Sequence, residues 1–443
     1  MASYRKAVPD FASLLNDAIA PQVTRTLTSP DHEQTHLCIY LPYARQRHLA
    51  VALSQAQGEL FSPAQYVLRS ALIGSNGDSP LVVLGCTRKK RAEPASANEL
   101  YISRRFKASL RLVRALDAPY AILSGKHGIV SPEATLEPYD LNLADVSSAK
   151  RRLWAGKVLK QLRSRGKGRK ITLLATPDYT TPLVEINKES DLPLALETPW
   201  VQLEKPDRLV WLDEAFRFAS RIRDLRMFYS WIDERRRTGH VFHFQTLASQ
   251  AVPKRGVYIF LDRREPNFLG AQPRIVRIGT HAVSLGSKAT LRGRLRNHLG
   301  PANEIGNHRG SIFRLHVGRA MLEANTGLDR LPSWGEGQDA SPHIKAAESG
   351  HELAVSRYLQ ELEVALIEID DEPTKDSLRA SVEAQLVALC TESMQTIDSP
   401  TPDWLGLQSP VAVIRQSGLW NIRGVGGKYD PKGAGSIASI IEA

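Results

Sequence analysis

The sequence predicts an α/β protein in which a three-layer domain with a parallel sheet is followed by a small α+β domain. Between residues 79 and 213, the apolar runs LVVLG, YAILS and ITLLAT alternate with segments of helical periodicity. This alternation is typical of parallel strands that are covered by helices on both faces. After residue 250 two short apolar runs, GVYIF and RIVRIG, are separated only by a polar loop, which favours a separate and smaller α+β domain.

A chain of 443 residues is too long for one ordinary hydrophobic core. We expect four segments: a small N-terminal extension (1–78), the α/β domain (79–213), a helical linker (214–250) and the α+β domain (251–443). In the extension the pattern predicts helices near 10–19 and 44–56 and a strand in HLCIYLPY. The turn-rich SNGDSP marks the first boundary.

Hydrophobic periodicity predicts the remaining elements. Helices are expected over 98–116, 147–162 and 289–299, and in SLRASVEAQLVALCTES with a core stripe of Leu378, Val382, Leu386 and Leu389. The runs SIFRLHVG and VALIEID predict strands, and the polar segment 325–350 predicts a long mobile loop.

The net charge of +11 is concentrated in two parts of the chain. Residues 88–170 hold 20 Lys and Arg against 7 Asp and Glu, and a second basic segment covers 274–319. Such concentrated charge favours phosphate partners over a uniform solvated coat, although solvated helix faces remain the alternative. Three distant cysteines exclude a disulfide framework, and no apolar run is long enough for a bilayer. We therefore expect a cytoplasmic protein without a membrane partner.

Several residue types in the C-terminal half suit the hydrolysis of a phosphodiester, which needs a base, positive charge and help for the leaving oxygen. The phenol of Tyr258 is a candidate base, the planar fork of Arg294 suits a phosphate, and Glu383 offers an oxygen ligand for one Mg²⁺. His298 follows Arg294 by one helical turn and borders the same predicted cleft.

The order Gly256-Val257-Tyr258, Arg277-Ile278-Gly279, an arginine helix and a glutamate helix resembles the GIY-YIG nuclease family over about residues 250–425. The resemblance implies Mg²⁺-dependent cleavage of DNA, with Glu383 as the metal ligand. The catalytic residues that it implies are Tyr258, Arg277, His281, Arg294 and Glu383. Arg277 stands where the family usually has its second tyrosine, which leaves the division of labour between Tyr258, Arg277 and His281 open. The expected nucleic-acid-binding residues are Arg292, Arg296, His298, Asn307, His308, Arg309 and Asn421.

A second constellation follows the three strands of the α/β domain. Their carboxyl ends should meet at one crevice, and the residues expected there are Cys86, Lys89, Tyr101, Phe106, Ser124, Lys126, His127, Tyr139 and Asp140. This stretch resembles an uncharacterised bacterial and phage domain and, remotely, uracil-DNA glycosylases. The resemblance implies a nucleotide or base pocket, with Tyr139 or Phe106 stacking on a flipped base and Asp140 reading its edge. A purely structural turn and core remain the alternative.

Together the two constellations predict a Mg²⁺-dependent DNA endonuclease, a phosphodiester hydrolase whose N-terminal domain recognises or excises a base. The expected partner is double-stranded DNA, including base-modified DNA, in defence such as restriction of phage DNA, or in repair. Two alternatives stay open at this point: a nucleic-acid-binding protein without catalytic activity, and an enzyme that processes RNA or tRNA.

Overall fold

The computed structural model describes most of the chain. The described residues are 25–28, 35–38, 68, 71–74, 79–201, 203, 205–270, 273–300, 306–324, 331–374, 376–392, 396–433, 437 and 440. The helices expected near 10–19 and 44–56 lie outside this part. Within the expected strand HLCIYLPY, the described residues belong to β2 (Thr35–Cys38), which pairs antiparallel with β1 (Arg25–Thr28).

The described residues divide into two compact units with a boundary between Ala219 and Ser220. This boundary falls inside α8 (Asp207–Arg237), a helix of 31 residues. Each unit has its own sheet. In the part of the chain that is described, no helix has the length and apolar character needed to span a bilayer.

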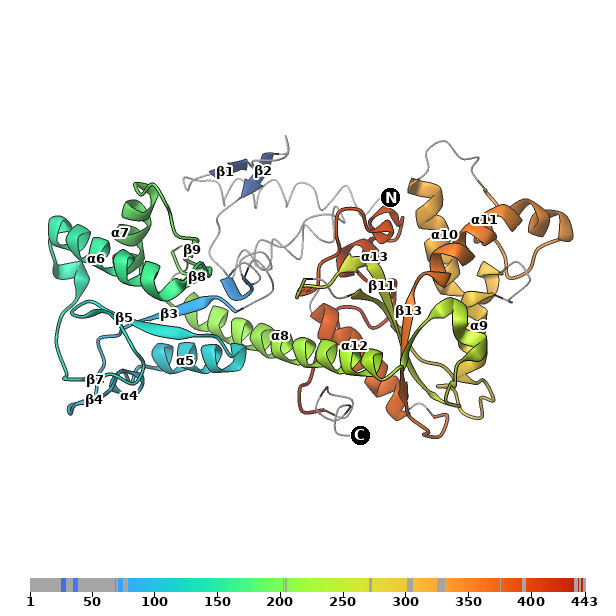
Figure 1. The fold of residues 1–443 in the computed structure, drawn as a ribbon, viewed down its shortest axis with the longest axis horizontal. Coiled ribbons are helices and arrows are strands. Elements are labelled where there is room, and N and C mark those ends of the chain that lie inside the picture. The colour runs from blue at the N-terminus through green and yellow to red at the C-terminus, as the bar shows by residue number, and fades with distance from the viewer. Residues whose placement is uncertain are drawn as a thin grey trace, which may run out of the picture. The chain divides into compact units, whose positions relative to one another are not determined.

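Unit 1 is built on a five-stranded sheet with the order β6-β5-β3-β8-β9. The strands are β3 (Leu81–Gly85), β5 (Tyr120–Ser124), β6 (Gly128–Val130), β8 (Ile171–Leu174) and β9 (Leu196–Glu197). All are parallel except β6, which turns back antiparallel on β5. Figure 1 shows α5 on one side of this sheet and α6 and α7 on the other. Their bounds are Arg104–Leu116, Ser148–Gly166 and Pro177–Lys188.

The helix expected over 98–116 is divided in two. The first part is α4 (Ala97–Leu100), and its chain becomes extended at Tyr101, which pairs with Lys90. Ser103 then starts α5 by accepting a hydrogen bond from the Phe106 amide at 3.2 Å, as an N-cap serine does. Nearby, β4 (Ala95–Ser96) pairs with β7 (Thr135–Leu136). These short pairings bring the loop after β3, Tyr101 and the segment after β7 together.

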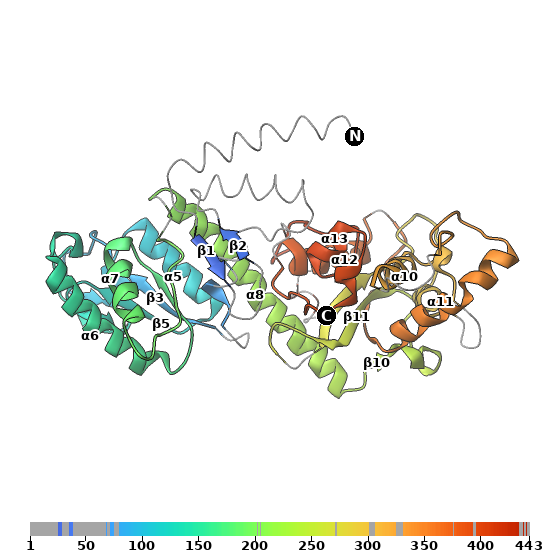
Figure 2. The same cartoon turned by 90° about the horizontal axis from the view of Figure 1, so that it is seen from above.

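Unit 2 contains a four-stranded antiparallel sheet with the order β10-β13-β11-β12. The strands are β10 (Val241–His243), β11 (Gly256–Pro266), β12 (Pro273–Gly279) and β13 (Glu363–Glu368). Its longer helices are α9 (Leu291–Leu299), α10 (Ile312–Ala324), α11 (Pro342–Gln360) and α12 (Leu378–Thr391). Figures 1 and 2 both show α10 beside α11.

The core of unit 2 lies between this sheet and its helices and is rich in aromatic rings. Phe260 contacts Phe313 of α10 with ring centres 5.3 Å apart, and Phe313 in turn faces Trp420 at 6.2 Å. Leu291 and Leu295 of α9 are fully buried in the same cluster, as their spacing predicts. This core fixes α9 against the sheet.

Three predictions for unit 2 are wrong. SIFRLHVG does not form a strand but begins α10, in which Phe313, Val317 and Ala320 are buried at helical spacing. The segment expected as a loop contains the first half of α11, which Ser341 caps by accepting from the Ile344 amide. Leu378 is 45% exposed, because it is the first residue of α12 and lies outside the core stripe.

Candidate active site

Tyr258 of β11 and Gly279 of β12 lie opposite each other. A Cβ atom on Gly279 would overlap the Tyr258 hydroxyl oxygen, and one on Gly256 would overlap the Ile367 carbonyl of β13. Both glycines are therefore required by close approach and not by an unusual backbone angle. The two tripeptides expected to mark the site also allow β11 to pack closely against β12 and β13 around the tyrosine.

The Tyr258 hydroxyl is fully buried and faces a histidine. Its oxygen lies 2.9 Å from His298 Nε2, and His298 Nδ1 lies 2.7 Å from Ser311 Oγ. Burial holds the pKa of His298 well below its ordinary value, and the nearby charges of Arg277 and Arg294 lower it further. His298 is therefore neutral at neutral pH, with one nitrogen available to accept a proton.

Arg277 is held on β12 by the C-terminal segment. Its Nη1 donates to the Trp420 carbonyl at 2.8 Å, and its guanidinium lies 4.8 Å from the centre of the Phe313 ring. Trp420 is itself joined to β12 through its amide, which donates to the Val276 carbonyl at 2.7 Å. Among the described residues the buried Nε of Arg277 has no hydrogen-bond partner. This donor is therefore buried without an acceptor, and a ligand can reach it only if the surrounding groups move.

Arg294 of α9 and Glu383 of α12 are both half-buried. Burial raises the pKa of the Glu383 carboxyl, while the charges of Arg277 and Arg294 act against this rise. A hydrogen bond from the Thr280 amide also favours the carboxylate. The charges of Arg277 and Arg294 therefore act on both His298 and Glu383.

His281 follows β12, and the charge of Arg294 acts on it as well. Burial lowers its pKa to about 4, and the charges of Arg379 and Arg294 contribute. A contact with the Lys254 carbonyl opposes the shift. His281 is therefore neutral at neutral pH and contributes a polar ring and no charge. Arg379 forms an ion pair with Asp371, with Nε and Oδ1 2.5 Å apart.

The site offers a metal ion one carboxylate. Among the described residues no three His, Cys, Asp or Glu side chains are grouped as a metal cluster. Mg²⁺ often takes only one or two carboxylates and completes its coordination with water and substrate phosphates. Glu383 fits such a site, and the surrounding arginines make a bound phosphate the expected source of further oxygen ligands.

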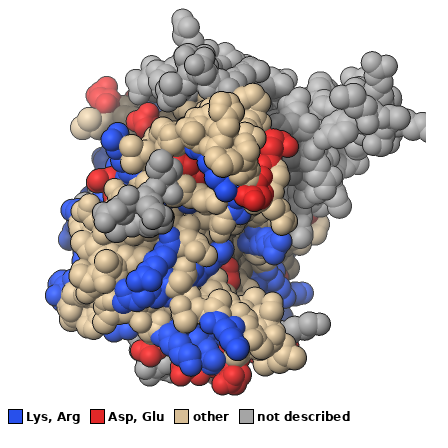
Figure 3. Space-filling view, turned by 90° about the vertical axis from the view of Figure 1, so that its right-hand side faces the viewer, with Lys and Arg blue, Asp and Glu red and all other residues tan. Residues whose placement is uncertain are grey.

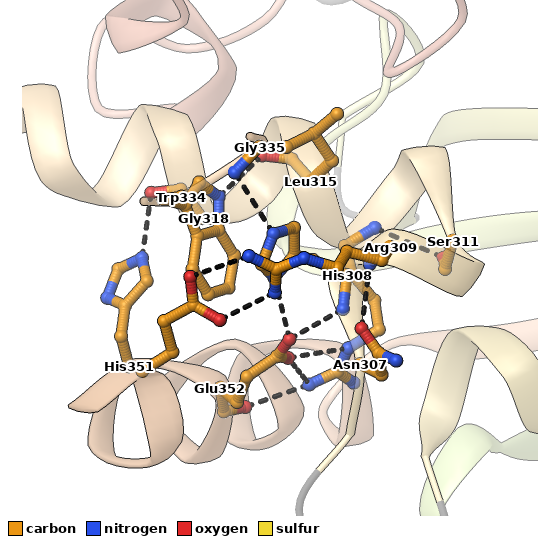
Figure 4. A network of polar contacts seen from close by, with 12 residues as sticks. Asn307, His308, Arg309, Ser311, Leu315, Gly318, Trp334, Gly335, His351 and Glu352 are labelled. Atoms are coloured by element: carbon orange, nitrogen blue, oxygen red, sulfur yellow. Dashed lines mark hydrogen bonds and ion pairs between the residues drawn. The ribbon is translucent and has the colours of Figure 1, made fainter. Parts of the chain in front are cut away.

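Two residues expected to bind nucleic acid are paired inside the protein, which corrects that prediction (Figure 4). Arg309 donates to both carboxylate oxygens of Glu348, at 2.6 and 3.0 Å, and both side chains are almost fully buried. His308 donates from Nδ1 to Glu352 at 2.9 Å and accepts from the Gly335 amide at 3.0 Å. The charge of Arg309 is thus paired with a buried carboxylate, and the His308 ring is held by Glu352 and the Gly335 amide.

Asn421, Arg292 and Asn307 also have internal partners. Asn421 accepts from the Ile278 amide at 3.1 Å and donates to the Ile278 carbonyl at 2.8 Å, so it anchors β12. Arg292 donates to the carbonyls of Leu247 and Gln250. The carbonyl oxygen of the Asn307 side chain accepts from the Arg309 amide at 2.9 Å. Arg296 is exposed and keeps its expected role as a prediction.

The residues expected in the N-terminal crevice meet in unit 1, but they differ in exposure. Buried positions are occupied by Cys86, Tyr101, Phe106 and Ser124, half-buried ones by His127 and Tyr139, and exposed ones by Lys89, Lys126 and Asp140. Phe106 packs on Tyr101 with ring centres 5.1 Å apart. Because Phe106 is a core residue, Tyr139 is the only ring of the two stacking candidates that reaches the surface.

The sequence analysis missed the residues that support His298. Arg314 is fully buried and donates to the carbonyls of His298 and Leu299 at 3.1 Å each, which holds the end of α9. It also pairs with Glu352 of α11, with Nη2 and Oε2 2.6 Å apart. Within SIFRLH only the placement of an arginine among apolar residues could have signalled a buried ion pair. Its partner lies 38 residues further along the chain.

An antiparallel sheet that presents a buried tyrosine, two arginines and a carboxylate to one neighbourhood defines a class of protein suited to phosphodiester chemistry. Residues 219–443 match the family model of the GIY-YIG domain, and the chain belongs to this family, whose members are nucleases. Residues 81–214 match a family of unknown function, DUF6884. The resemblance to the GIY-YIG family and the resemblance of the N-terminal domain to an uncharacterised family are therefore confirmed, whereas the remote likeness to uracil-DNA glycosylases stays a prediction. No curated protein and no solved structure matches the chain.

Proposed function

We propose that unit 2 is a Mg²⁺-dependent endonuclease that hydrolyses one phosphodiester bond of duplex DNA. The observation that carries this proposal is the proximity of Glu383 to Arg277 and Arg294 beside the buried Tyr258–His298 pair. Membership of a nuclease family supports it. The arrangement supplies positive charge, a proton acceptor and an oxygen ligand within one site.

In the proposed mechanism the two arginines bind the scissile phosphate. Arg277 offers its unpartnered Nε and the remaining donors of a guanidinium that one carbonyl already orients. Arg294 approaches from α9 with a second planar fork. Such forks match phosphate oxygens in a bidentate manner, and their fixed charge stabilises the negative charge that develops on the phosphate.

Proton transfer is assigned to Tyr258 and His298. We place the His298 proton on Nδ1, facing Ser311, so that Nε2 accepts from the Tyr258 hydroxyl. The phenol then takes a proton from the attacking water while its own proton moves to His298. Because the phenol is fully buried in the free protein, the DNA-bound state has to admit one water to it.

Glu383 is the proposed metal ligand. The Thr280 amide orients its carboxylate, and burial raises its pKa, so that a metal ion competes with a proton for the same oxygen. Mg²⁺ bound there would supply positive charge to the leaving oxygen. His281 is proposed to position water or phosphate as a neutral donor or acceptor.

Exposed basic side chains are proposed to bind the DNA backbone around this site. Three of them are exposed: Lys254 before β11, Lys288 just before α9, and Arg296 within α9. Figure 3 shows Lys and Arg side chains spread over the middle and lower part of one face of the molecule. Contacts of this kind bind without reading sequence and weaken as salt rises.

The test is nicking of supercoiled DNA by the full chain with Mg²⁺ or with a chelator. We expect cleavage only with Mg²⁺, its loss in Glu383→Gln, and unchanged DNA binding by that variant. Glu323→Gln is the matched control, because Glu323 is exposed near the end of α10. Wild-type cleavage rates in Glu383→Gln, or cleavage of tRNA with none of DNA, would contradict the proposal.

For unit 1 we propose recognition of a base, with its excision as the stronger form of the hypothesis. In this proposal the half-buried Tyr139 stacks on the base and the exposed Asp140 next to it reads the base edge. A variant Asp140→Ala should then abolish formation of abasic sites while leaving cleavage of DNA with pre-made abasic sites intact. Equal loss of both activities would count against this division of labour.

The remaining finer proposals concern organisation and biology. We infer a three-layer domain over 79–213 and a nuclease domain over 251–443, joined by 214–250 and preceded by the extension 1–78. The boundary of the two units inside α8 supports a division in this region. A cytoplasmic enzyme that acts on base-modified foreign DNA, or on damaged DNA in repair, would combine the two sites. Parallel digestion of unmodified and phage-modified DNA separates these roles.

A further inference from the structure

Tyr139 is the centre of a polar cluster in unit 1. Lys90 contacts it from the loop after β3, and Tyr101 from the break between α4 and α5. Ser124, the last residue of β5, and Lys126, in the loop after β5, contact it as well. The bridge between Lys90 and Tyr101 and the pairing of β4 with β7 hold these segments together. The proposed nuclease reaction uses none of these residues.

Three hydroxyl groups form a chain in this cluster. The Tyr139 oxygen lies 2.8 Å from Ser124 Oγ and 2.8 Å from the Tyr101 oxygen. Ser124 Oγ also accepts from the backbone amides of Lys126 and His127, at 3.2 and 3.0 Å. Since a hydroxyl oxygen has two lone pairs, Ser124 has no further acceptor capacity and must donate its own proton to Tyr139.

The chain contains one proton more than it can accommodate. Three hydroxyl protons share two hydroxyl–hydroxyl contacts, so one proton remains after Ser124 donates to Tyr139. It is the Tyr101 proton when Tyr139 donates to Tyr101, and the Tyr139 proton when Tyr101 donates to Tyr139. Besides Tyr139, the Tyr101 hydroxyl has Ser124 as a side-chain hydrogen-bond partner, but the Ser124 oxygen already accepts from two backbone amides and cannot take the Tyr101 proton. The Tyr101 side chain is 1% exposed. A buried donor without an acceptor is unfavourable, and an oxygen of a bound ligand would satisfy it.

The surroundings of the chain select an anionic ligand. Lys90 Nζ lies 4.4 Å from the centre of the Tyr139 ring and 5.8 Å from that of Tyr101, and Lys126 Nζ lies 5.7 Å from the Tyr139 ring. Burial lowers the pKa of Lys90, with the charge of Asp140 opposing the shift. An anion placed between the two lysines would compensate this desolvation.

We propose that Tyr101, Tyr139, Lys90 and Lys126 form a site for a phosphate group, in which Tyr101 donates a hydrogen bond and the two lysines supply the charge. A phosphate fits better than a single carbonyl because it brings both negative charge and several acceptor oxygens. Both a free nucleotide and a terminal phosphate of DNA carry this group. The inference deepens the base-recognition role proposed above for unit 1 by assigning what holds the phosphate of that nucleotide.

The test is calorimetric titration of the full chain in the presence of a chelator, so that cleavage does not interfere. Thymidine 5′-monophosphate and a 5′-phosphorylated oligonucleotide are compared with thymidine and the unphosphorylated oligonucleotide. We expect binding that requires the phosphate, through the mononucleotide, the DNA end or both. Comparison of the mononucleotide with the phosphorylated oligonucleotide shows whether the site takes a free nucleotide or the phosphorylated end of DNA. Equal binding with and without phosphate, or no binding by any probe, would overturn the proposal.

Two variants locate the binding. Tyr101→Phe removes the hydroxyl that donates to the phosphate and accepts from Tyr139, and it should weaken binding of the phosphorylated probe by roughly tenfold or more, as expected for a hydrogen bond to a charged group. Tyr120→Phe is the matched control, because Tyr120 donates to Asn98 at 3.0 Å at the other end of β5. Lys90→Gln provides a second variant with the hydroxyl chain intact and should also weaken binding.

The outcomes separate this site from the proposed nuclease. Loss of binding in Arg294→Ala but not in Tyr101→Phe would place the nucleotide in unit 2 and overturn the inference. If Tyr101→Phe loses phosphate binding while plasmid nicking fails even for the wild type, the phosphate site stands and the nuclease proposal fails. If Tyr101→Phe keeps wild-type affinity for the phosphorylated probe while plasmid nicking is intact, the phosphate-site proposal fails and the nuclease proposal stands.

Discussion

Replacing Tyr258 by phenylalanine removes the hydroxyl that the proposed mechanism uses and little else. The ring keeps its contact with Phe260, at 5.5 Å between ring centres, and no cavity larger than one oxygen is created. His298 Nε2 loses a partner at 2.9 Å inside a fully buried site. Leaving a buried polar atom unpaired costs about 1–3 kcal/mol of unfolding free energy, which a domain with about 5–15 kcal/mol survives.

The effect on the reaction should be much larger than the effect on folding. A positioned general base contributes roughly 10²- to 10⁴-fold to a rate, so single-turnover nicking by Tyr258→Phe should fall by this factor at unchanged DNA affinity. Tyr358→Phe is the matched control, because the Tyr358 hydroxyl also donates to a buried partner, Asp262, at 3.2 Å. Urea denaturation of both variants measures the cost to folding.

Two results would refute the reasoning. Nicking at the wild-type rate by Tyr258→Phe would mean that this hydroxyl takes no part in proton transfer. Equal loss of activity in Tyr258→Phe and Tyr358→Phe would mean that the loss follows from general destabilisation of unit 2.

Further predictions concern packing, ion pairing and pH. Gly279→Ala should lower the unfolding free energy by about 1–3 kcal/mol through overpacking against Tyr258. Gly310→Ala is the control, because a Cβ there meets open space, and it should change the unfolding free energy by less than about 0.5 kcal/mol. Equal effects of the two substitutions in urea denaturation would contradict this prediction. Arg309→Ala should lower the unfolding free energy by about 3–5 kcal/mol, because Glu348 stays buried without its partner. The DNA affinity of this variant, measured by fluorescence polarisation, should be unchanged. A weaker DNA affinity at wild-type stability would instead indicate that Arg309 binds DNA. Three buried histidines of unit 2 have pKa values lowered by burial: His281, His298 and His316. Since the unfolded chain binds these protons near pH 6.5 and the folded chain does not, stability should fall from about pH 6.5 towards pH 4 by up to about 1.4 kcal/mol per pH unit for each histidine, and a flat profile in denaturation at pH 7, 6 and 5 would contradict the assignment.

The strands could be predicted because their signal is local. LVVLG, YAILS, GVYIF and RIVRIG each form a strand, and nearly all of their residues are buried. Runs of this kind need no knowledge of partners. SIFRLHVG failed because its alternation of apolar and polar residues is that of a half-exposed strand. In the structure Arg314 and His316 are buried as well, so the alternation does not mark a solvent face.

The candidate site could be predicted in its members and less well in their partners. The order of Tyr258, Arg277, Arg294 and Glu383 in the sequence predicted that they share one site, and their roles in that site stay predictions. His298 was expected to touch nucleic acid, yet it pairs with a tyrosine 40 residues earlier. A basic side chain is expected to be exposed when no partner lies close to it in the sequence. Hydrogen-bonded pairs between residues far apart in the sequence leave no local signal.

The glycines of the two tripeptides give a further lesson about motifs. Gly256 and Gly279 are needed because the neighbouring strand and the tyrosine ring fill the space of a side chain. A motif can therefore mark a packing requirement and a catalytic residue at once. The phosphate site proposed for unit 1 has no such short signature, because Tyr101 and Tyr139 are 38 residues apart.

The central claim is that Arg294 and Glu383 act on the same phosphate, and a double-mutant cycle tests it most directly. Single-turnover nicking rates of Arg294→Ala, Glu383→Gln and the double variant are compared with the wild type at saturating DNA and Mg²⁺. Groups that act as one unit are strongly non-additive, so the double variant should be little slower than the slower single variant. Rate losses that multiply would contradict a shared phosphate.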